Sequence, residues 1–168
     1  ARPSTSRLAI RAAGAIKSVG SVGALLPLCA SSNESVATLA MISLSQIQSA
    51  DAYSTAEALL TSRKLPIRKA ALSLVALFPL QAIETAKRLM SDADERVARI
   101  GVELLGAVGT PEALKEVGQR LTDPSYGIRI EAVLALAGKC PAEFRQAFMI
   151  LRDDPIPAVR MVARRLNP

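Results

Sequence analysis

The sequence offers few side chains for catalysis, because its 168 residues include no histidine. Without imidazole the chain lacks the usual general base, most zinc and iron sites, and the Ser-His and Cys-His nucleophile pairs. We therefore expect a protein that is not an enzyme and that holds no metal or cofactor.

Two acidic clusters could in principle supply oxygen ligands for a hard cation. They are Asp92, Asp94 and Glu95 in one place and Asp153 and Asp154 in the other. Neither has the glycine or the alternating register of a calcium loop. Both stand just before an expected helix, where carboxylates favour the positive end of the helix dipole. We interpret them as helix-start electrostatics.

Basic residues are the other candidate for chemistry, since the formal charge is +6 from 21 Lys and Arg against 15 Asp and Glu. A line of them could follow a phosphate backbone, with affinity falling steeply as salt rises. However, there is no polybasic tail, and no aromatic side chain lies beside them for base stacking. Nucleic-acid or polyanion binding is therefore the alternative reading, and it would use Arg63, Lys64, Arg68, Lys69, Arg96 and Arg99.

A short pattern recurs roughly every 30 residues: an aliphatic residue followed four residues later by a small one. A recurrence of this length is typical of helical repeats, so we expect helices to position these side chains. The aliphatic positions are Leu8, Val36, Ile67, Val97, Ile128 and Val159, and the small ones are Ala12, Ala40, Ala71, Gly101, Ala132 and Ala163. An unbroken column of small residues predicts close helix packing. With 50% apolar and only 3% aromatic residues, the chain predicts an all-α fold.

We expect an α-solenoid (superhelix) of antiparallel helix pairs, about five and a half pairs in one domain over residues 1–168, in which each aliphatic position starts a second helix. The fourth and fifth repeats show the signals best. Thr110 can cap a first helix that stops at Asp123-Pro124, and the second helix should run over about 128–137 and end at Gly138. The expected buried residues are Leu114, Val117 and Leu121 in this first helix and Phe144, Phe148 and Leu151 in the next first helix, which opens at Cys140-Pro141.

The segments 92–121, 123–138 and 153–166 resemble HEAT repeats, specifically the short kind of about 30 residues first grouped with phycobilisome lyases. The resemblance implies a ladder in which an Asp of the inter-helix turn meets an Arg just after the aliphatic position. Asp123 with Arg129 and Asp154 with Arg160 match both positions. In earlier repeats Asp92 is followed by Ala98 and Ser62 by Arg68, so the ladder fades toward the N-terminus. The family name also suggests, as a further alternative, a lyase-like chaperone of a chromophore or cofactor.

The second helices should line the concave side of such a solenoid. Positions two and six residues after the aliphatic marker mix apolar anchors with charges, which suits a peptide or partner helix better than DNA. We therefore expect a non-catalytic protein-protein interaction scaffold or adaptor. Several of the apolar residues at these positions could instead be buried between neighbouring helix layers. In the first repeat the same two positions are Ile10 and Gly14. The expected partner-binding residues are Thr38, Ile42, Lys69, Ser73, Arg99, Glu103, Ile130, Leu134, Met161 and Arg165.

Cys29 and Cys140 lie about four helix layers apart, too far for a disulfide, so we expect free thiols and a reducing compartment, the cytoplasm. No apolar stretch reaches the ~20 residues of a membrane helix. Residues 19–30 are apolar, and an exposed face there would favour self-association or a covering domain. The sequence begins at Ala1 rather than Met, so we expect the native N-terminus to be missing, and the chain fits a piece of a larger protein.

Overall fold

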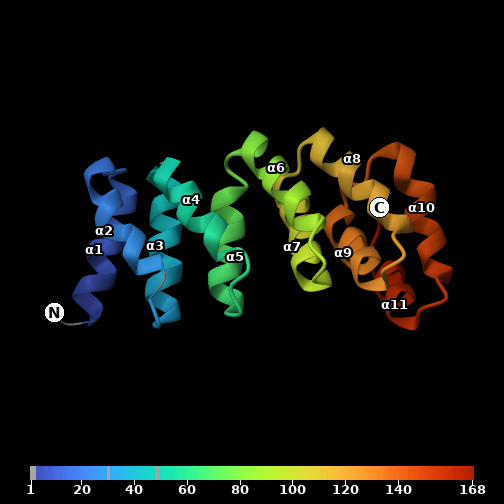
Figure 1. Ribbon diagram of the computed structural model, residues 1–168, viewed down its shortest axis with the longest axis horizontal. Helices are drawn as coiled ribbons and strands as arrows, with labels where there is room; N and C mark the ends of the chain where they lie inside the picture. The colour runs from blue at the N-terminus through green and yellow to red at the C-terminus, as the bar shows by residue number, and fades with distance from the viewer. Residues whose placement is uncertain (1–2, 30, 48–49) are drawn as a thin grey trace. The chain divides into compact units, whose positions relative to one another are not determined.

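The computed structural model describes residues 3–29, 31–47 and 50–168, and within these ranges every regular element is a helix (Figure 1). The chain divides into two compact units, Ala1–Phe78 and Pro79–Pro168, which are described here one at a time.

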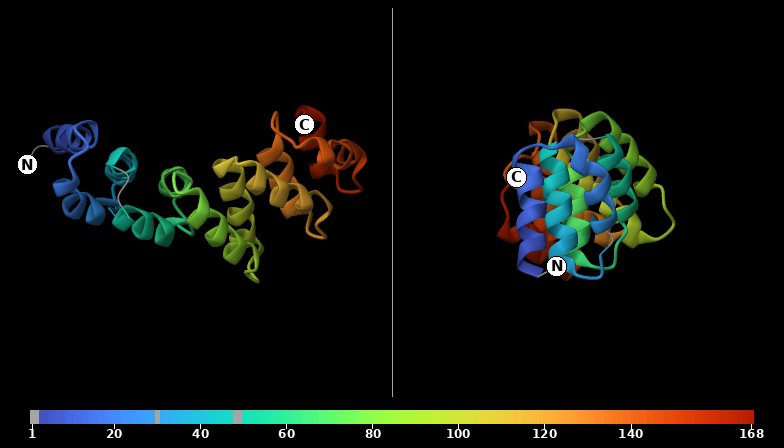
Figure 2. Two further views of the ribbon diagram at one scale, coloured as in Figure 1. Left: turned by 90° about the horizontal axis from the view of Figure 1, so that it is seen from above. Right: turned by 90° about the vertical axis from the view of Figure 1, so that its left-hand side faces the viewer.

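Unit 1 holds five α-helices in its described residues: α1 (Pro3–Ala15), α2 (Val22–Cys29), α3 (Glu34–Ile47), α4 (Ala50–Leu59) and α5 (Leu65–Val75). Helix α3 packs against α1 on one side and α5 on the other, while α2 and α4 form a second row behind them (Figure 2, left). The large buried side chains of this unit include Leu25, Met41, Leu44, Leu60 and Leu74.

Unit 2 repeats the arrangement with α6 (Pro79–Met90), α7 (Glu95–Val108), α8 (Pro111–Gln119), α9 (Tyr126–Leu136), α10 (Arg145–Ile150) and α11 (Pro157–Arg165). Short 3-10 turns extend α8 (Arg120–Thr122), precede α10 (Ala142–Phe144) and follow it (Leu151–Asp153). Helix α9 packs between α7 and α11, and α6 and α8 both pack against α7. The core is built from Val102, Leu104, Leu105, Leu121 and Leu136.

Helix pairing follows the sequence pattern. In the described residues the first helices of the pairs are α2, α4, α6, α8 and α10, and the second helices are α3, α5, α7, α9 and α11, preceded by α1 as an unpaired second helix. The prediction of an all-α solenoid of antiparallel helix pairs is therefore confirmed. The count of about five and a half pairs in a single solenoid domain over residues 1–168 stays a prediction.

Helix ends in unit 2 are set by capping residues. Thr110 Oγ1 accepts a hydrogen bond from the Ala113 N–H at 3.3 Å, as predicted. Gly138 takes the left-handed conformation (φ 70°), as predicted, in the turn that follows the end of α9 at Leu136, and its N–H donates to the Asn167 carbonyl oxygen at 2.8 Å. Helix α9 spans Tyr126–Leu136 rather than 128–137, because Ser125 Oγ accepts from the Ile128 N–H and thereby starts the helix earlier.

The column of small residues is confirmed in five repeats, where Ala40, Ala71, Gly101, Ala132 and Ala163 are all buried. A Cβ added at Gly101 would lie 2.6 Å from the Ala86 carbonyl oxygen, so α6 and α7 touch at the backbone there.

In α1 the predicted register is wrong by two residues. Leu8 and Ala12 are exposed, whereas Ile10 and Gly14 are buried, and Gly14 faces the backbone of Ser43 in α3. Ile10 and Gly14 therefore belong to the core and not to a binding face.

The predicted stripe of the last first helix is confirmed at Phe148 and Leu151, which are buried, while Phe144 is half-buried with its ring against Gly118. Within the described part of the apolar stretch, 19–29, Val22, Leu25 and Cys29 are buried in unit 1, whereas Val19, Ala24 and Pro27 are exposed. Leu8 and Ile16, which precede the stretch, are exposed as well. Self-association through these apolar side chains stays a prediction.

Both cysteines are free and buried, as predicted. Burial raises the pKa of the Cys29 thiol to about 11, and burial likewise raises the pKa of Cys140, partly offset by the charge of Arg145. Among the described helices, none is long and apolar enough to cross a bilayer.

Candidate functional site

The polar ladder is the best-defined side-chain arrangement in unit 2. Arg129 donates from Nε to Asp154 Oδ2 at 2.9 Å and from Nη2 to Asp154 Oδ1 at 3.0 Å. Its Nη1 donates to the carbonyl oxygens of Asp123 (2.8 Å) and Pro124 (3.1 Å) in its own turn. One guanidinium thus joins the turn that precedes its helix to the carboxylate of the following turn.

Asp154 stays ionised in this setting. Burial raises its pKa, but hydrogen bonds from Arg129 and from the Ile156 N–H, together with the charges of Arg129 and Arg160, outweigh that effect and bring the pKa below its usual value. Its side chain is 4% exposed, against 12% for Arg129.

The same arginine position repeats its backbone contacts elsewhere. Arg160 Nη1 donates to the carbonyl oxygens of Asp154 (2.6 Å) and Pro155 (3.0 Å), and Arg68 Nη1 donates to that of Ser62 (3.0 Å). From the sequence we expect Asp154 to pair with Arg160, which follows it in the same repeat. In the structure its carboxylate instead pairs with Arg129 of the preceding repeat.

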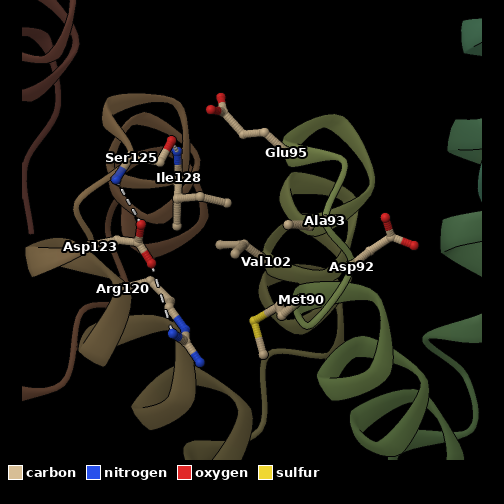
Figure 3. A pocket seen from close by; sticks show the side chains of 10 residues that line it. Met90, Asp92, Ala93, Glu95, Val102, Arg120, Asp123, Ser125 and Ile128 are labelled. Atoms are coloured by element: carbon tan, nitrogen blue, oxygen red, sulfur yellow. Dashed lines mark hydrogen bonds and ion pairs between the residues drawn. The ribbon is translucent and has the colours of Figure 1, made fainter.

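The ladder is interrupted at Ala98, and a cavity of about 230 Å³ opens there between the turn 91–94 and the turn 123–125. Figure 3 shows Asp92, Ala93 and Glu95 on one side of it and Arg120, Asp123 and Ser125 on the other. Asp123 Oδ1 accepts from the Ser125 N–H at 2.9 Å, and Arg120 Nη1 lies 3.8 Å from Asp123 Oδ2.

The acidic cluster at the start of α7 acts as predicted for a helix start. Asp94 Oδ1 accepts from the Arg96 N–H at 2.9 Å and caps the helix, and Asp92 Oδ1 accepts from the Asp94 N–H at 2.8 Å. Hydrogen bonds from the Arg96 side chain and backbone hold the pKa of Asp94 below its usual value. In the described part of the chain, His, Cys, Asp and Glu form no group of three that could hold a metal ion.

In unit 1 the structure brings together all four predicted partner-binding residues. Thr38 and Ile42 of α3 and Lys69 and Ser73 of α5 line one groove of about 340 Å³. The groove also includes four residues that the sequence pattern did not select: Met41, Ser45, Pro66 and Ala70. These lie one helical turn from the predicted positions, so a wider helical stripe would have included them.

In unit 2 the six predicted residues lie on three helices packed in a row: Arg99 and Glu103 on α7, Ile130 and Leu134 on α9, and Met161 and Arg165 on α11. Glu103 and Leu134 line a groove of about 320 Å³. Arg99 Nη2 donates to Glu131 Oε2 at 3.1 Å. Met161 and Arg165 are exposed, and Ile130 is half-buried.

Sequence reasoning missed Lys139 and Glu131 beside this second groove. Lys139 donates from Nζ to the Gly106 carbonyl oxygen. Its position after the turn at Gly138 depends on how the chain leaves the helix, and helical periodicity does not describe that.

The basic residues of the alternative reading fall in both units and are partly engaged. Lys64 Nζ donates to the Ser32 carbonyl oxygen at 3.0 Å, and Arg96 pairs with Asp94 at 2.8 Å. Arg68 and Arg99 have the partners given above. Arg63 and Lys69 are exposed.

The sequence is similar to a known protein family, since the family model described as HEAT repeats matches residues 82–166. This match does not distinguish the short phycobilisome-lyase-like kind. Among curated proteins, none matches the sequence.

Three solved structures are similar. An engineered protein has a TM-score of 0.46 at 21% identity, covering 86% of this chain and 76% of its own. A designed armadillo repeat protein in complex with the peptide (KR)4 has a TM-score of 0.48 at 20% identity, covering 86% and 80%. A computationally designed armadillo repeat protein for modular peptide recognition has a TM-score of 0.44 at 17% identity, covering 93% and 89%. At these scores the similarity carries no information about what this chain binds.

Proposed function

Because the chain belongs to the HEAT-repeat family, we propose that it is a non-catalytic scaffold that binds a partner polypeptide on the faces that second helices form within its units. The observation that carries the proposal is the groove between α3 and α5, into which four independently predicted side chains converge. A groove between two packed helices suits an extended peptide or one face of a partner helix.

The groove in unit 1 is apolar with one charge at its edge. Ile42 is 47% exposed although it lies beside the core. The hydroxyls of Ser45 and Ser73 donate to carbonyl oxygens of their own helices, Ile42 O at 2.7 Å and Lys69 O at 3.0 Å. Lys69 is therefore the one charged group among the residues that line the groove, beside the hydroxyl of Thr38. The matching partner segment therefore carries an apolar side chain with a carboxylate close to it.

The corresponding face in unit 2 also exposes apolar side chains, with Leu134 48% exposed on α9 and Met161 exposed on α11. Exposed Leu and Met on adjacent helices are typical of surfaces that a partner covers. Arg165 adds an exposed cation at the end of α11.

The test is selection from a library of random peptides displayed on phage, followed by measurement of Kd for the enriched peptides at moderate salt. We expect enriched sequences to combine an apolar residue with an acidic one. Ile42→Arg should weaken binding at least tenfold, a loss of about 1.4 kcal/mol. Leu80→Arg is the matched control, because Leu80 is 78% exposed on α6 and lies outside the proposed face. Equal binding by both variants, or no enrichment, would contradict the proposal.

Polyanion binding is the competing outcome. Four of its six basic residues already contact acceptors within the chain, which supports the protein-binding proposal. If nucleic acid is the ligand, affinity for a single-stranded oligonucleotide will fall by orders of magnitude between about 50 and 200 mM salt. Arg63→Glu combined with Lys69→Glu will then abolish binding, and Ile42→Arg will not.

The compartment belongs to the same proposal. Two free, buried thiols in one chain are typical of a reducing environment. We expect the scaffold to act in the cytoplasm.

A further inference from the structure

The chain already holds one arginine side chain, that of Arg129, in a well-defined site between two turns. At Arg129, one guanidinium fills the space between two successive turns, where it meets two backbone carbonyls on one side and a carboxylate on the other. Arg68 and Arg160 occupy the same position in their repeats and make the same kind of carbonyl contact.

One repeat earlier than Arg129, the equivalent residue is Ala98, whose side chain ends at Cβ. The cavity of about 230 Å³ lies where the longer side chain would be. The carbonyls equivalent to those that Arg129 contacts belong to Asp92 and Ala93, and the carboxylate equivalent to Asp154 belongs to Asp123.

The cavity retains a carboxylate at the position equivalent to Asp154, that of Asp123. Within the described residues, Asp123 Oδ2 accepts no hydrogen bond, and its nearest cation, Arg120, is 3.8 Å away. The lining contains Asp92, Glu95, Asp123 and Arg120 and so has a formal charge of −2. Asp123 faces the cavity, Glu95 lies at its upper rim, and the carboxylate of Asp92 points away from it (Figure 3). A cation is therefore the complementary occupant.

The cavity walls also fit a flat group on an aliphatic stem. Met90, Val102 and Ile128 provide apolar contacts on its inner side (Figure 3). Its volume is below the roughly 300 Å³ at which sites for whole small-molecule ligands begin. It therefore suits one side chain rather than a cofactor.

We propose that this pocket binds the guanidinium of an arginine side chain from a partner polypeptide, in the place that Arg129 fills one repeat later. That the arginine comes from a partner polypeptide rests on the proposed function, whereas binding of an arginine side chain by the pocket does not. A planar, bidentate donor is favoured over the lysine ammonium, because Asp92, Ala93 and Asp123 stand at the repeat positions equivalent to the residues that accept from Arg129.

The test is a titration of the isotope-labelled full chain with N-acetyl-L-arginine amide, followed by NMR shifts of the backbone amides. We expect saturable shifts of Ala98, Val102 and Ile128 with a Kd on the order of millimolar, as one anchored side chain allows. The neutral isostere N-acetyl-L-citrulline amide should bind at least tenfold more weakly, and the corresponding lysine amide should bind more weakly than the arginine amide.

Two variants locate the site. Asp123→Asn keeps the Oδ1 that accepts from Ser125 but removes the charge, and it should weaken arginine binding about tenfold. Ala98→Arg places the missing guanidinium in the pocket, so it should abolish the shifts and raise the Tm. Gln146→Arg adds the same charge at an exposed position on α10 and should change neither.

Equal shifts with the citrulline amide, or unchanged binding in Asp123→Asn, would overturn the proposal. The outcome is independent of the groove at Ile42. If the peptide selection fails while arginine amide saturates the pocket, the pocket stands and the scaffold function falls. The reverse result removes the pocket alone.

Discussion

The ion pair between Arg129 and Asp154 stabilises unit 2 because each group is hydrogen-bonded on every side that faces the protein. Asp154 receives two bonds from Arg129 and one from the Ile156 N–H at 2.8 Å. Desolvation opposes such a pair, and it persists because these bonds and the charge of Arg160 compensate. Removing one partner therefore costs more than the pair contributes.

Asp154→Asn should lower the free energy of unfolding by about 3 kcal/mol, near the lower end of the range for breaking a buried pair. The reason is that the Arg129 side chain, which is only 12% exposed, would remain charged without its carboxylate. Urea denaturation followed by circular dichroism measures the loss. Asp153→Asn is the control, because Asp153 is an exposed residue that, among the described residues, pairs with Arg164 alone, and its removal should cost less than about 1 kcal/mol. Equal losses in the two variants would contradict this account of the ladder.

The same carboxylate gives a pH dependence. Because the pKa of Asp154 is lower in the folded state than in the unfolded chain, its contribution is complete above the unfolded value of about 3.9 and is lost as pH falls through the folded value. The stability difference between the wild-type chain and Asp154→Asn should therefore shrink steadily below about pH 4. Urea midpoints measured from pH 6 to pH 3 test this, and a difference that is constant with pH would exclude a charged Asp154.

At the scale of the helix, the small-residue column sets how closely neighbouring helices approach. Ala132 in α9 is fully buried, and a Cβ on Gly106 of α7 would lie 2.6 Å from the Cβ of Ala135 in α9. Two helices in such contact cannot admit a longer side chain without moving apart.

Ala132→Leu should lower the Tm by several degrees, since overpacking a core costs about 1–3 kcal/mol. Ala107→Leu is the matched control, because it makes the same change at an exposed position of α7, and its Tm should stay close to that of the wild type. Thermal melts followed by circular dichroism compare the two. Similar melting temperatures for both variants would show that the column does not set the helix spacing.

Much of this element structure could be predicted from periodicity, but the register of α1 could not. Both Leu8 with Ala12 and Ile10 with Gly14 place a small residue four positions after an aliphatic one. The pattern alone does not choose between them. Contact with Ser43 of α3 does, since Gly14 admits the α3 backbone at a distance where even an added Cβ would overlap with it.

At the scale of the whole molecule, the two units share the same repeat but differ in the polar side-chain interactions that hold helix ends and turns in place. In unit 2, Asp94, Thr110 and Ser125 cap helices with their side chains, and the ladder links successive turns. In unit 1, Asn33 Oδ1 caps α3 by accepting from the Ser35 and Val36 N–H groups. However, α2 contains Pro27 inside the helix, and Leu8 and Ile16 are exposed.

Sequence reasoning identified the faces of these helices but not the cavities between them. The groove in unit 1 could be predicted as a face because its residues recur at fixed positions along the repeat. The pocket at Ala98 could not, because it is produced by a side chain that is shorter than its equivalents, and its walls come from turns whose approach depends on the packing of α7 against α9.

These differences predict a gradient of local stability. In a repeat array each helix is held mainly by its neighbours, and α7 packs against α6, α8 and α9, whereas α1 has its main contact with α3 alone. Native-state hydrogen exchange should therefore show the amides of α7 and α9 protected by the largest opening free energies and those of α1 and α2 exchanging first. The exchange of α4 and α5 should be intermediate, as their unit has buried cores on both rows but no ladder pair among its described residues. Uniform protection across all helices would mean that the chain opens as one cooperative body, and the weaker ties in unit 1 would then have no energetic consequence.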